Sequence, residues 1–227
     1  VDRAAGDKLL ALLPEFAESA RATRAFLRRA VRHLTADVGI RQFLDIGTGL
    51  PAAENTHEVA QAIAPESRVV YVDNDPMVLA HARVLLTSTA EGRIDYLEAD
   101  VRDTDRILRA AATTLDLAQP VGVILLGVLD YIPDDKEAYG AVKALVDALA
   151  PGSHVAISHP TWEVNPVAID RAIEIWNAHG CPPMCARTPE AIADFFAGLE
   201  LLEPGIVSCS RWRPDNDIEA PPVIDYG

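Results

Sequence analysis

The sequence predicts an α/β fold in which a mostly parallel sheet is covered by helices on both faces. Three observations predict it. A short apolar strand at 42–46 runs into a glycine turn, and a helix-forming stretch follows at 52–63. A second, β-branched strand at 68–72 ends in an aspartate. A near-continuous apolar run at 121–126 is typical of a central parallel strand that is buried on both faces.

Composition narrows the class of protein. Of the 227 residues, 49% are hydrophobic and 24% are charged, which is ordinary for one globular α/β domain. The net charge is −14 and no face of the sequence is rich enough in Lys and Arg to indicate a phosphate-binding groove, so we expect no nucleic-acid partner. No apolar run approaches the ~18–20 residues of a membrane span, and no signal peptide is evident. With three cysteines, the chain is expected to be cytoplasmic and without a membrane partner.

The first strand leads into the stretch Phe43-Leu44-Asp45-Ile46-Gly47-Thr48-Gly49-Leu50-Pro51. We call residues 47–51 the glycine elbow. Its two glycines allow φ > 0 and have no Cβ to hold a ligand away, and Pro51 stands where a starting helix tolerates a missing N–H. Open α/β sheets bind nucleotide-like ligands at such a place. The candidate contacts are Asp45, Gly47, Thr48 and Gly49.

The spacing Gly47-x-Gly49-x-x-Ala52 also satisfies a loose dinucleotide fingerprint. Two details disfavour a pyrophosphate: Asp45 would add a negative charge beside it, and Pro51 removes one N–H donor. A ligand with an ammonium group and no phosphate, such as S-adenosylmethionine (SAM), suits the turn better. An NAD-dependent oxidoreductase remains an alternative, and so does a SAM-binding protein without turnover.

The next two strands also end near acids. The strand at 68–72 ends in Asp73-Asn74, and Asp73 lies 24 residues beyond Gly49. That separation is close to the one expected for a carboxylate that accepts ribose hydroxyl groups. The strand at 94–98 leads to Asp100-Val101, where a carboxylate and a backbone N–H could bind an adenine edge. The simpler alternatives are that Asp73 only ends its strand and that Asp100 caps the helix expected at 104–112.

Asp45, Asp73 and Asp100, in this order and spacing, resemble the ligand set of class I SAM-dependent methyltransferases. The resemblance covers roughly residues 42–159. The glycine-elbow stretch, Asn-Thr-His-Glu-Val-Ala and Val-Tyr-Val-Asp-Asn-Asp-Pro are similar to a bacterial family of uncharacterised SAM methyltransferases, formerly a domain of unknown function. The resemblance implies a Rossmann-like, seven-stranded, doubly wound sheet that is mostly parallel with an antiparallel C-terminal strand, together with an N-terminal helical lid.

We expect a single domain over residues 1–227, made of four segments. They are an N-terminal helical lid at 1–38, a SAM-binding core at 39–159, a substrate-side insertion at 160–187, and a C-terminal helix and hairpin at 188–227. In the last segment, apolar runs at 199–202 and 206–212 flank Glu203-Pro204-Gly205 and predict the closing strand pair.

The catalytic candidates follow the fourth and fifth strands. In class I methyltransferases the end of the fourth strand lies beside the methyl group, which implies Gly127 and Leu129 as cofactor contacts and Asp130 and Tyr131 as catalytic residues. His159 emerges at the carboxyl end of the fifth strand, where a histidine can serve as a general base near neutral pH. Each of these residues could instead only order its loop.

The resemblance implies direct displacement of the sulfonium methyl group by an unidentified, small-molecule acceptor. No metal is expected, because His179, Cys181 and Cys185 are one ligand short of a structural zinc site. The sequence indicates neither the acceptor nor an oligomeric state.

Overall fold

The computed structural model describes residues 6, 8, 11–13, 16–163 and 165–214. The chain forms two compact units. The first unit comprises Val1–Phe26, Gly127–Tyr139 and Ser158–Gly227, and the second comprises Leu27–Leu126 and Gly140–Ile157. The expected organisation as one domain of four segments stays a prediction.

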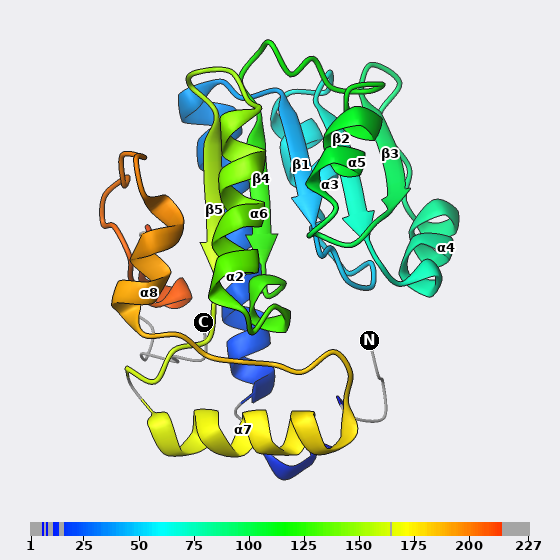
Figure 1. The fold of residues 1–227 in the computed structure, drawn as a ribbon. Helices are drawn as coiled ribbons and strands as arrows, with labels where there is room; N and C mark the ends of the chain where they lie inside the picture. The colour runs from blue at the N-terminus through cyan, green and yellow to red at the C-terminus, as the bar shows by residue number, and fades with distance from the viewer. Residues whose placement is uncertain (1–5, 7, 9–10, 14–15, 164, 215–227) are drawn as a thin grey trace. The chain divides into compact units, whose positions relative to one another are not determined.

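The second unit is built on a five-stranded sheet in the order β3-β2-β1-β4-β5 (Figure 1). The strands are β1 (Gln42–Ile46), β2 (Arg68–Asp73), β3 (Arg93–Glu98), β4 (Gly122–Leu126) and β5 (His154–Ser158). Phe43 of β1 lies opposite Val69 of β2 and Gly122 of β4, and both pairings are parallel. Because neighbouring strands are parallel, the carboxyl ends of β1, β2 and β3 meet at one edge of the sheet.

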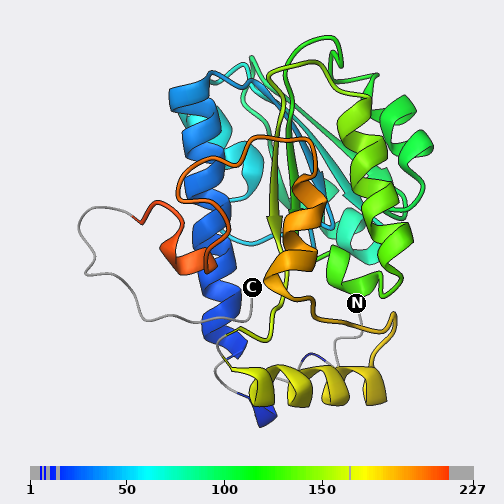
Figure 2. The ribbon, with the colours of Figure 1, turned by 60° about the vertical axis from the view of Figure 1, so that its left-hand side comes forward.

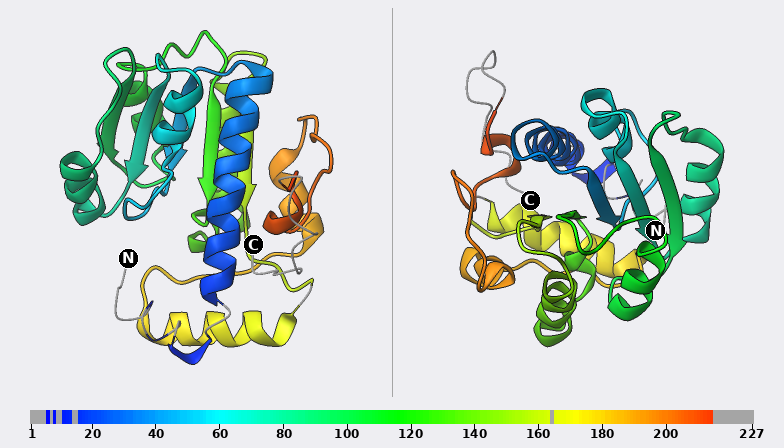
Figure 3. Two further views of the ribbon diagram at one scale, coloured as in Figure 1. Left: turned by 180° about the vertical axis from the view of Figure 1, so that it is seen from behind. Right: turned by 90° about the horizontal axis from the view of Figure 1, so that it is seen from above.

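Helices cover both faces of this sheet, as predicted. The end of α2 (Phe16–His33) and α3 (Thr56–Ile63) lie on one face, and α5 (Thr104–Ala111) and α6 (Asp135–Asp147) lie on the other (Figures 1 and 3). On the first face, apolar side chains from both helices form one cluster with alternate residues of the strands. The members from the strands and helices are Leu27, Val31, Leu34, Phe43, Val59, Ala60, Val69, Tyr71 and Ile124.

The helix ends carry local signals that the sequence contains. A π-helical turn, η1 (Leu34–Val38), follows α2 and ends at Gly39, whose φ is 87°. The carboxylate of Asp75 accepts the Met77 N–H at the start of α4 (Pro76–Leu85), and proline stands in the first turn, where its missing N–H is tolerated. At α3, the Asn55 N–H donates to Glu58 Oε2 at 2.7 Å, which is half of a capping box.

The first unit contains α7 (Pro166–His179) and α8 (Pro189–Ala193), with short 3₁₀ turns η2 (Leu129–Tyr131), η3 (Asp194–Phe196) and η4 (Cys209–Arg211). Residues 180–188, which we call the return segment, run back along α7 before α8 begins (Figure 2). Trp176 of α7 donates its indole N–H to Pro182 O at 2.8 Å, and Asn177 bonds both backbone groups of Met184. Met184 is buried in a core cluster with Trp176.

The structure corrects the prediction of a C-terminal hairpin. Among the described residues the sheet has five strands and not seven, and no antiparallel strand forms at 199–202 or 206–212. The backbone here closes local turns instead: the Gly205 N–H donates to Leu202 O at 2.8 Å. Glu203 O accepts from Arg213 Nε at 2.9 Å. Pro204 cannot donate to a strand ladder, and the adjacent glycine favours a turn.

The N-terminal segment, where a helical lid is expected at 1–38, contains α2 and η1, from Phe16 to Val38. Residues 14–15 and the tail beyond Pro214 lie outside the described residues. None of the helices in the described ranges is long and apolar enough to cross a membrane.

Candidate functional site

The glycine elbow leaves β1 at the carboxyl edge of the sheet in the conformation that the sequence predicts. Gly47 and Gly49 have φ values of 77° and 63°, a region that favours glycine. The Gly47 N–H donates to Val72 O at 2.8 Å, which ties the elbow to the neighbouring strand. A Cβ added at Gly49 would meet no atom within 4 Å. The elbow therefore presents bare backbone to open space.

Asp73 holds the elbow in place from the end of β2. Its side chain is buried, at 6% exposure. Oδ2 accepts the Gly49 N–H and Oδ1 accepts the Asp75 N–H, each at 2.9 Å. A carboxylate oxygen can accept more than one hydrogen bond. Asp73 thus organises the elbow and keeps acceptor capacity on both oxygens.

Asp45 links β1 to the first turn of α3. It is also buried, and its Oδ2 accepts the hydroxyl of Thr56 at 2.5 Å. Tyr71 lies opposite Asp45 on β2, and burial, with the negative charge of Asp45, raises the pKa of the Tyr71 phenol well above its ordinary value. Because Thr56 is the first residue of α3, its bond places the Asp45 carboxylate near the positive end of that helix, where a negative charge is stabilised.

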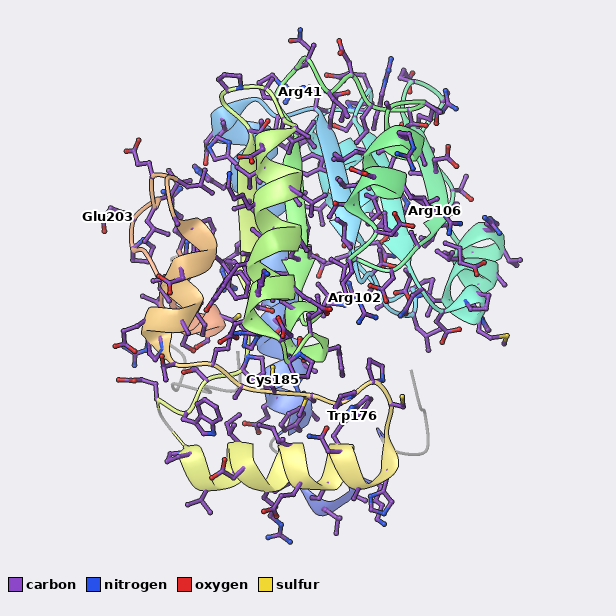
Figure 4. The ribbon with its side chains drawn as sticks, in the orientation of Figure 1. Arg41, Arg102, Arg106, Trp176, Cys185 and Glu203 are labelled. Atoms are coloured by element: carbon purple, nitrogen blue, oxygen red, sulfur yellow. The ribbon has the colours of Figure 1, made fainter. Side chains whose placement is uncertain are left out.

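Asp100 makes an ion pair that the sequence analysis did not foresee. Its two oxygens accept from Arg102 Nε and Nη2 at 2.8 and 2.7 Å. The hydrogen bonds from Arg102 lower the pKa of the Asp100 carboxyl, and the Asn74 side chain contributes another. The helix-capping alternative belongs to Asp103, which accepts the Arg106 N–H. Val101 is buried, at 8% exposure. Figure 4 labels Arg102, the partner of Asp100, and Arg106 of the following helix.

In the first unit, the loop after β4 carries four candidate residues. Gly127 has a φ of 62°, and a Cβ there would meet no atom within 4 Å. Leu129 is fully buried. Asp130 is 5% exposed, and its Oδ1 has no hydrogen-bond partner among the described residues. Burial raises the pKa of the Asp130 carboxyl to about 7, against the opposing effects of a backbone hydrogen bond and the charge of Arg187.

Tyr131 packs against Trp176 with ring centroids 5.4 Å apart. Figure 4 shows Trp176 pointing from α7 towards the return segment, which also carries Cys185. Burial, followed by the charge of Asp130, raises the pKa of the Tyr131 phenol far above its ordinary value. Tyr131 is therefore a neutral phenol at physiological pH.

His159 is buried with both ring nitrogens engaged. Nδ1 lies 2.9 Å from Pro160 O, which can only accept, so Nδ1 carries the hydrogen. Nε2 lies 2.6 Å from Arg187 Nη1, which can only donate. Burial lowers the pKa of His159 to about 4. The imidazole is therefore neutral at pH 7, and neither nitrogen is free to take a proton.

Arg187 is the residue that sequence reasoning missed. Its guanidinium is buried, and it bonds Leu129 O at 3.1 Å, Ile132 O at 2.7 Å and Asp135 Oδ1 at 2.9 Å. The segment around it matches no motif. The available signal was weak: it is the lone charged residue within 180–189.

A family model with the description S-adenosyl methyltransferase matches residues 1–225. The chain belongs to the S-adenosyl methyltransferase family. The match confirms the predicted family, and it supports SAM as the cofactor over the NAD-dependent alternative.

Solved structures similar to this S-adenosyl methyltransferase support the same family assignment. A DUF574 family protein from Streptomyces avermitilis is 46% identical, with a TM-score of 0.89 over 95% of this chain and 82% of its own. A candidate methyltransferase from Thermobifida fusca is 40% identical, with a TM-score of 0.87 over 96% of this chain and 81% of its own. TnmH is 19% identical, with a TM-score of 0.54 over 83% of this chain and 53% of its own, and shows the fold alone. A search of curated proteins returned no match.

The structure thus gathers the predicted methyltransferase residues into two groups. In the second unit, the elbow, Asp45 and Asp73 lie together, and Asn74 joins Asp73 to Asp100. In the first unit, Arg187 bonds Leu129 and His159 and its charge acts on Asp130, and Tyr131 follows Asp130 in the same short turn. The enzyme is a SAM-dependent methyltransferase with a Rossmann-like α/β fold, and its acceptor is unidentified.

Proposed function

We propose that the enzyme methylates a small molecule whose nucleophilic atom carries a proton, and that Asp130 accepts this proton. One observation carries the proposal: a buried carboxyl with an unpartnered oxygen and a pKa of about 7. Such a group has no structural bond to maintain at Oδ1. It is ionised in a large fraction of molecules near neutral pH, where general base catalysis is most effective.

We infer that the glycine elbow and Asp73 hold SAM. Gly47, Thr48 and Gly49 would contact the methionine end, since the elbow exposes backbone to open space. Asp73 would accept the ribose hydroxyl groups through the acceptor capacity left on its two oxygens. SAM supplies a sulfonium methyl group as the electrophile.

The remaining candidates for contact with SAM are supported to different degrees. The adenine contact assigned to Asp100 and Val101 would need the exposed ion pair with Arg102 to leave one oxygen accessible. Asn74, also a cofactor candidate, would act beside Asp100, to which its side chain hydrogen-bonds. Asp45, bonded to Thr56, would act through its negative charge on the ammonium group rather than by direct contact. Gly127 and Leu129 would border the methyl group, as the resemblance implies; a Cβ at Gly127 would meet no atom within 4 Å, whereas the Leu129 side chain is buried.

Methyl transfer by direct displacement needs alignment and removal of one proton. SAM, held by the glycine elbow and Asp73, would supply the methyl group; the acceptor atom would bond to the methyl carbon as the carbon–sulfur bond breaks and its electrons return to sulfur. The acceptor proton would pass to Asp130 Oδ1. Alignment of the reactants alone can lower such a barrier by roughly 7–11 kcal/mol. Deprotonation is required because an ammonium nitrogen has no lone pair, and a hydroxyl oxygen is only a weak nucleophile while it keeps its proton.

Asp130 is a better candidate for the base than His159 or Tyr131. Both nitrogens of His159 are bonded, and burial keeps its pKa near 4. The raised pKa of Tyr131 keeps its phenol protonated, so it is suited to donating a hydrogen bond. A small acceptor is favoured over a nucleic acid because the chain has a net charge of −14.

Two experiments test the proposal. Thermal-shift assays with SAM, S-adenosylhomocysteine and NAD should show stabilisation by the first two only. Transfer of a labelled methyl group from SAM to a metabolite extract should then yield a labelled small molecule, and Asp130→Asn should abolish it while still binding S-adenosylhomocysteine. Full transfer by Asp130→Asn would refute the base assignment. The absence of transfer by the wild-type enzyme to any extract fraction would favour a SAM-binding protein without turnover.

A further inference from the structure

The guanidinium of Arg187 connects parts of the first unit that are far apart in the sequence. Nη1 and Nη2 donate to Leu129 O and Ile132 O, the carbonyl groups on either side of Asp130 and Tyr131. Nη1 also donates to His159 Nε2, and Nε donates to Asp135 Oδ1 at the start of α6. One side chain thus bonds the loop after β4, the end of β5 and α6.

We propose that Arg187 is a positioning residue for methyl transfer: it fixes the loop that presents Asp130, and it supplies the positive charge that favours the ionised form of that carboxyl. The inference rests on the proposed function only for the role of Asp130 as the base. The geometry and the charge effect hold for the enzyme without its substrates.

The positional part of the argument comes from the backbone of the loop. Buried carbonyl groups need donors, and an unpaired one costs about 1–3 kcal/mol. Arg187 Nη2 donates to Ile132 O, and Arg187 Nη1 is a second donor to Leu129 O, which also accepts the Ile132 N–H. The Cys185 N–H donates to the carbonyl of Asp130 itself at 2.8 Å. Residues 185–187 therefore determine where the loop lies, and with it the direction of the Asp130 side chain.

The electrostatic part comes from the groups around Asp130. Burial raises the pKa of the Asp130 carboxyl, and the positive charge of Arg187 lowers it. Burial, with a smaller contribution from the charge of Asp130, raises the pKa values of Tyr131 and Cys185, so both side chains are neutral. Asp135 bonds Arg187 Nε, and its carboxylate is 65% exposed, so water screens its charge from the interior more than that of Arg187.

His159 completes the arrangement as a neutral acceptor. Its Nδ1–H bonds Pro160 O, and this bond leaves the Nε2 lone pair directed at Arg187. The Arg187 N–H also bonds Pro160 O at 3.0 Å. A protonated His159 would place two cations 2.6 Å apart, so the neutral tautomer is a condition for the geometry.

The test uses the full chain without SAM or acceptor, and compares Arg187→Gln, Arg187→Lys and the control Arg106→Gln. Arg106 is an exposed arginine of α5, so its variant removes the same charge from the surface. The titration of the Asp130 carboxyl is followed by ¹³C NMR. We expect Arg187→Gln to titrate at higher pH than wild type, and Arg187→Lys and Arg106→Gln to titrate close to wild type. An unchanged titration in Arg187→Gln would overturn the charge role.

Hydrogen exchange at the Tyr131 and Ile132 amides reports the loop geometry. Both amides bond within the turn, to Val128 O and Leu129 O. Because Lys cannot reproduce the planar fork of Arg, both Arg187 variants should exchange on the order of tenfold or more faster there, while Arg106→Gln should not. Unchanged exchange in Arg187→Lys would overturn the positioning role.

A measurement on the wild-type enzyme covers the case in which the Arg187 variants do not fold. ¹⁵N NMR of His159 should show a neutral ring with hydrogen on Nδ1 throughout pH 5–8. A His159 that protonates near its ordinary pKa would overturn the proposal. None of these readouts uses methyl transfer, so their failure is distinct from failure of the proposed function.

Discussion

At the scale of single residues, the carboxyl of Asp130 keeps its proton in the folded chain at pH values where an ordinary aspartate has lost it. Between the ordinary pKa near 4 and the folded value of about 7, the folded state binds the proton and the unfolded state does not. Stability must therefore fall as pH rises through this window.

Asp130→Asn removes this pH dependence. An amide mimics the protonated carboxyl, so the variant should match wild type near pH 4 and be more stable at pH 8, by an amount on the order of a few kcal/mol. Urea unfolding at several pH values measures the difference. Asp105→Asn, at an exposed position of α5, should show no such divergence. A variant less stable than wild type at pH 8 would contradict the buried, unpartnered state of Asp130.

Asp73 should matter for cofactor affinity. Asp73→Ala removes the acceptor of the Gly49 N–H and the proposed acceptor of the ribose hydroxyls. We expect the Kd for SAM to rise well over tenfold, since hydrogen bonds to a charged group contribute about 1.5–3 kcal/mol each. Isothermal titration calorimetry measures it, with Asp105→Ala as the control for loss of a carboxylate. Unchanged affinity would remove Asp73 from the site.

The residues that sequence reasoning found and missed differ in one physical respect. The roles of Gly47, Gly49 and Asp73 follow from local chain geometry, which the order of strand, turn and helix makes visible. The Arg187 side chain bonds His159, 28 positions away, and Leu129, 58 positions away, and no local pattern encodes such contacts. The pairing of Asp100 with Arg102 was visible in principle, because the two are neighbours in sequence.

At the scale of elements, the attachment of α3 to β1 depends on one buried hydroxyl. Thr56 is fully buried and donates to Asp45 Oδ2. Thr56→Val keeps the shape and removes the donor, so it should lower the free energy of unfolding by about 1.5–3 kcal/mol. Thr56→Ser keeps the hydroxyl and should lose less. Equal losses for the two variants in urea denaturation would show that packing, and not the hydrogen bond, holds α3.

The return segment lies so close to α7 that it requires glycine at its first position. A Cβ at Gly180 would lie 2.8 Å from the indole of Trp176, which is itself buried and hydrogen-bonded. Gly180→Ala should therefore destabilise the chain by about 1–3 kcal/mol.

Gly140 provides the matched comparison. It lies in α6, and an added Cβ there would meet no atom within 4 Å. Gly140→Ala should stabilise the chain by about 0.5–1 kcal/mol, because alanine loses less conformational freedom in a helix. Thermal unfolding of both variants checks the pair. A destabilised Gly140→Ala or a neutral Gly180→Ala would contradict the packing described.

Most elements were predictable because each carries its own signal. The strands β1, β2, β3 and β4 begin and end within about two residues of the predicted ranges, since apolar and β-branched runs mark them. The hairpin at 199–212 was predicted from the same kind of run, and there the signal failed. Strand formation depends on a partner strand and not only on composition, and Pro204 with Gly205 ends the run in turns.

At the scale of the whole molecule, the two units divide the predicted site residues between them. The cofactor candidates Asp45, Asp73 and Asp100 belong to the second unit, and Asp130 with His159 belongs to the first. Variants of the two groups should therefore have separable effects. We expect variants of Asp73 in the second unit to change SAM affinity, and variants of Asp130 in the first unit to change methyl transfer with S-adenosylhomocysteine affinity retained.

The fluorescent side chains of the protein also lie in one unit. All three tryptophans, Trp162, Trp176 and Trp212, belong to the first unit, while the sheet is built without an indole. Intrinsic fluorescence excited at the indole band is thus a dye-free optical signal of one half of the fold, and circular dichroism averages over both. Superimposed melting curves from the two methods would mean that the halves melt as one cooperative body.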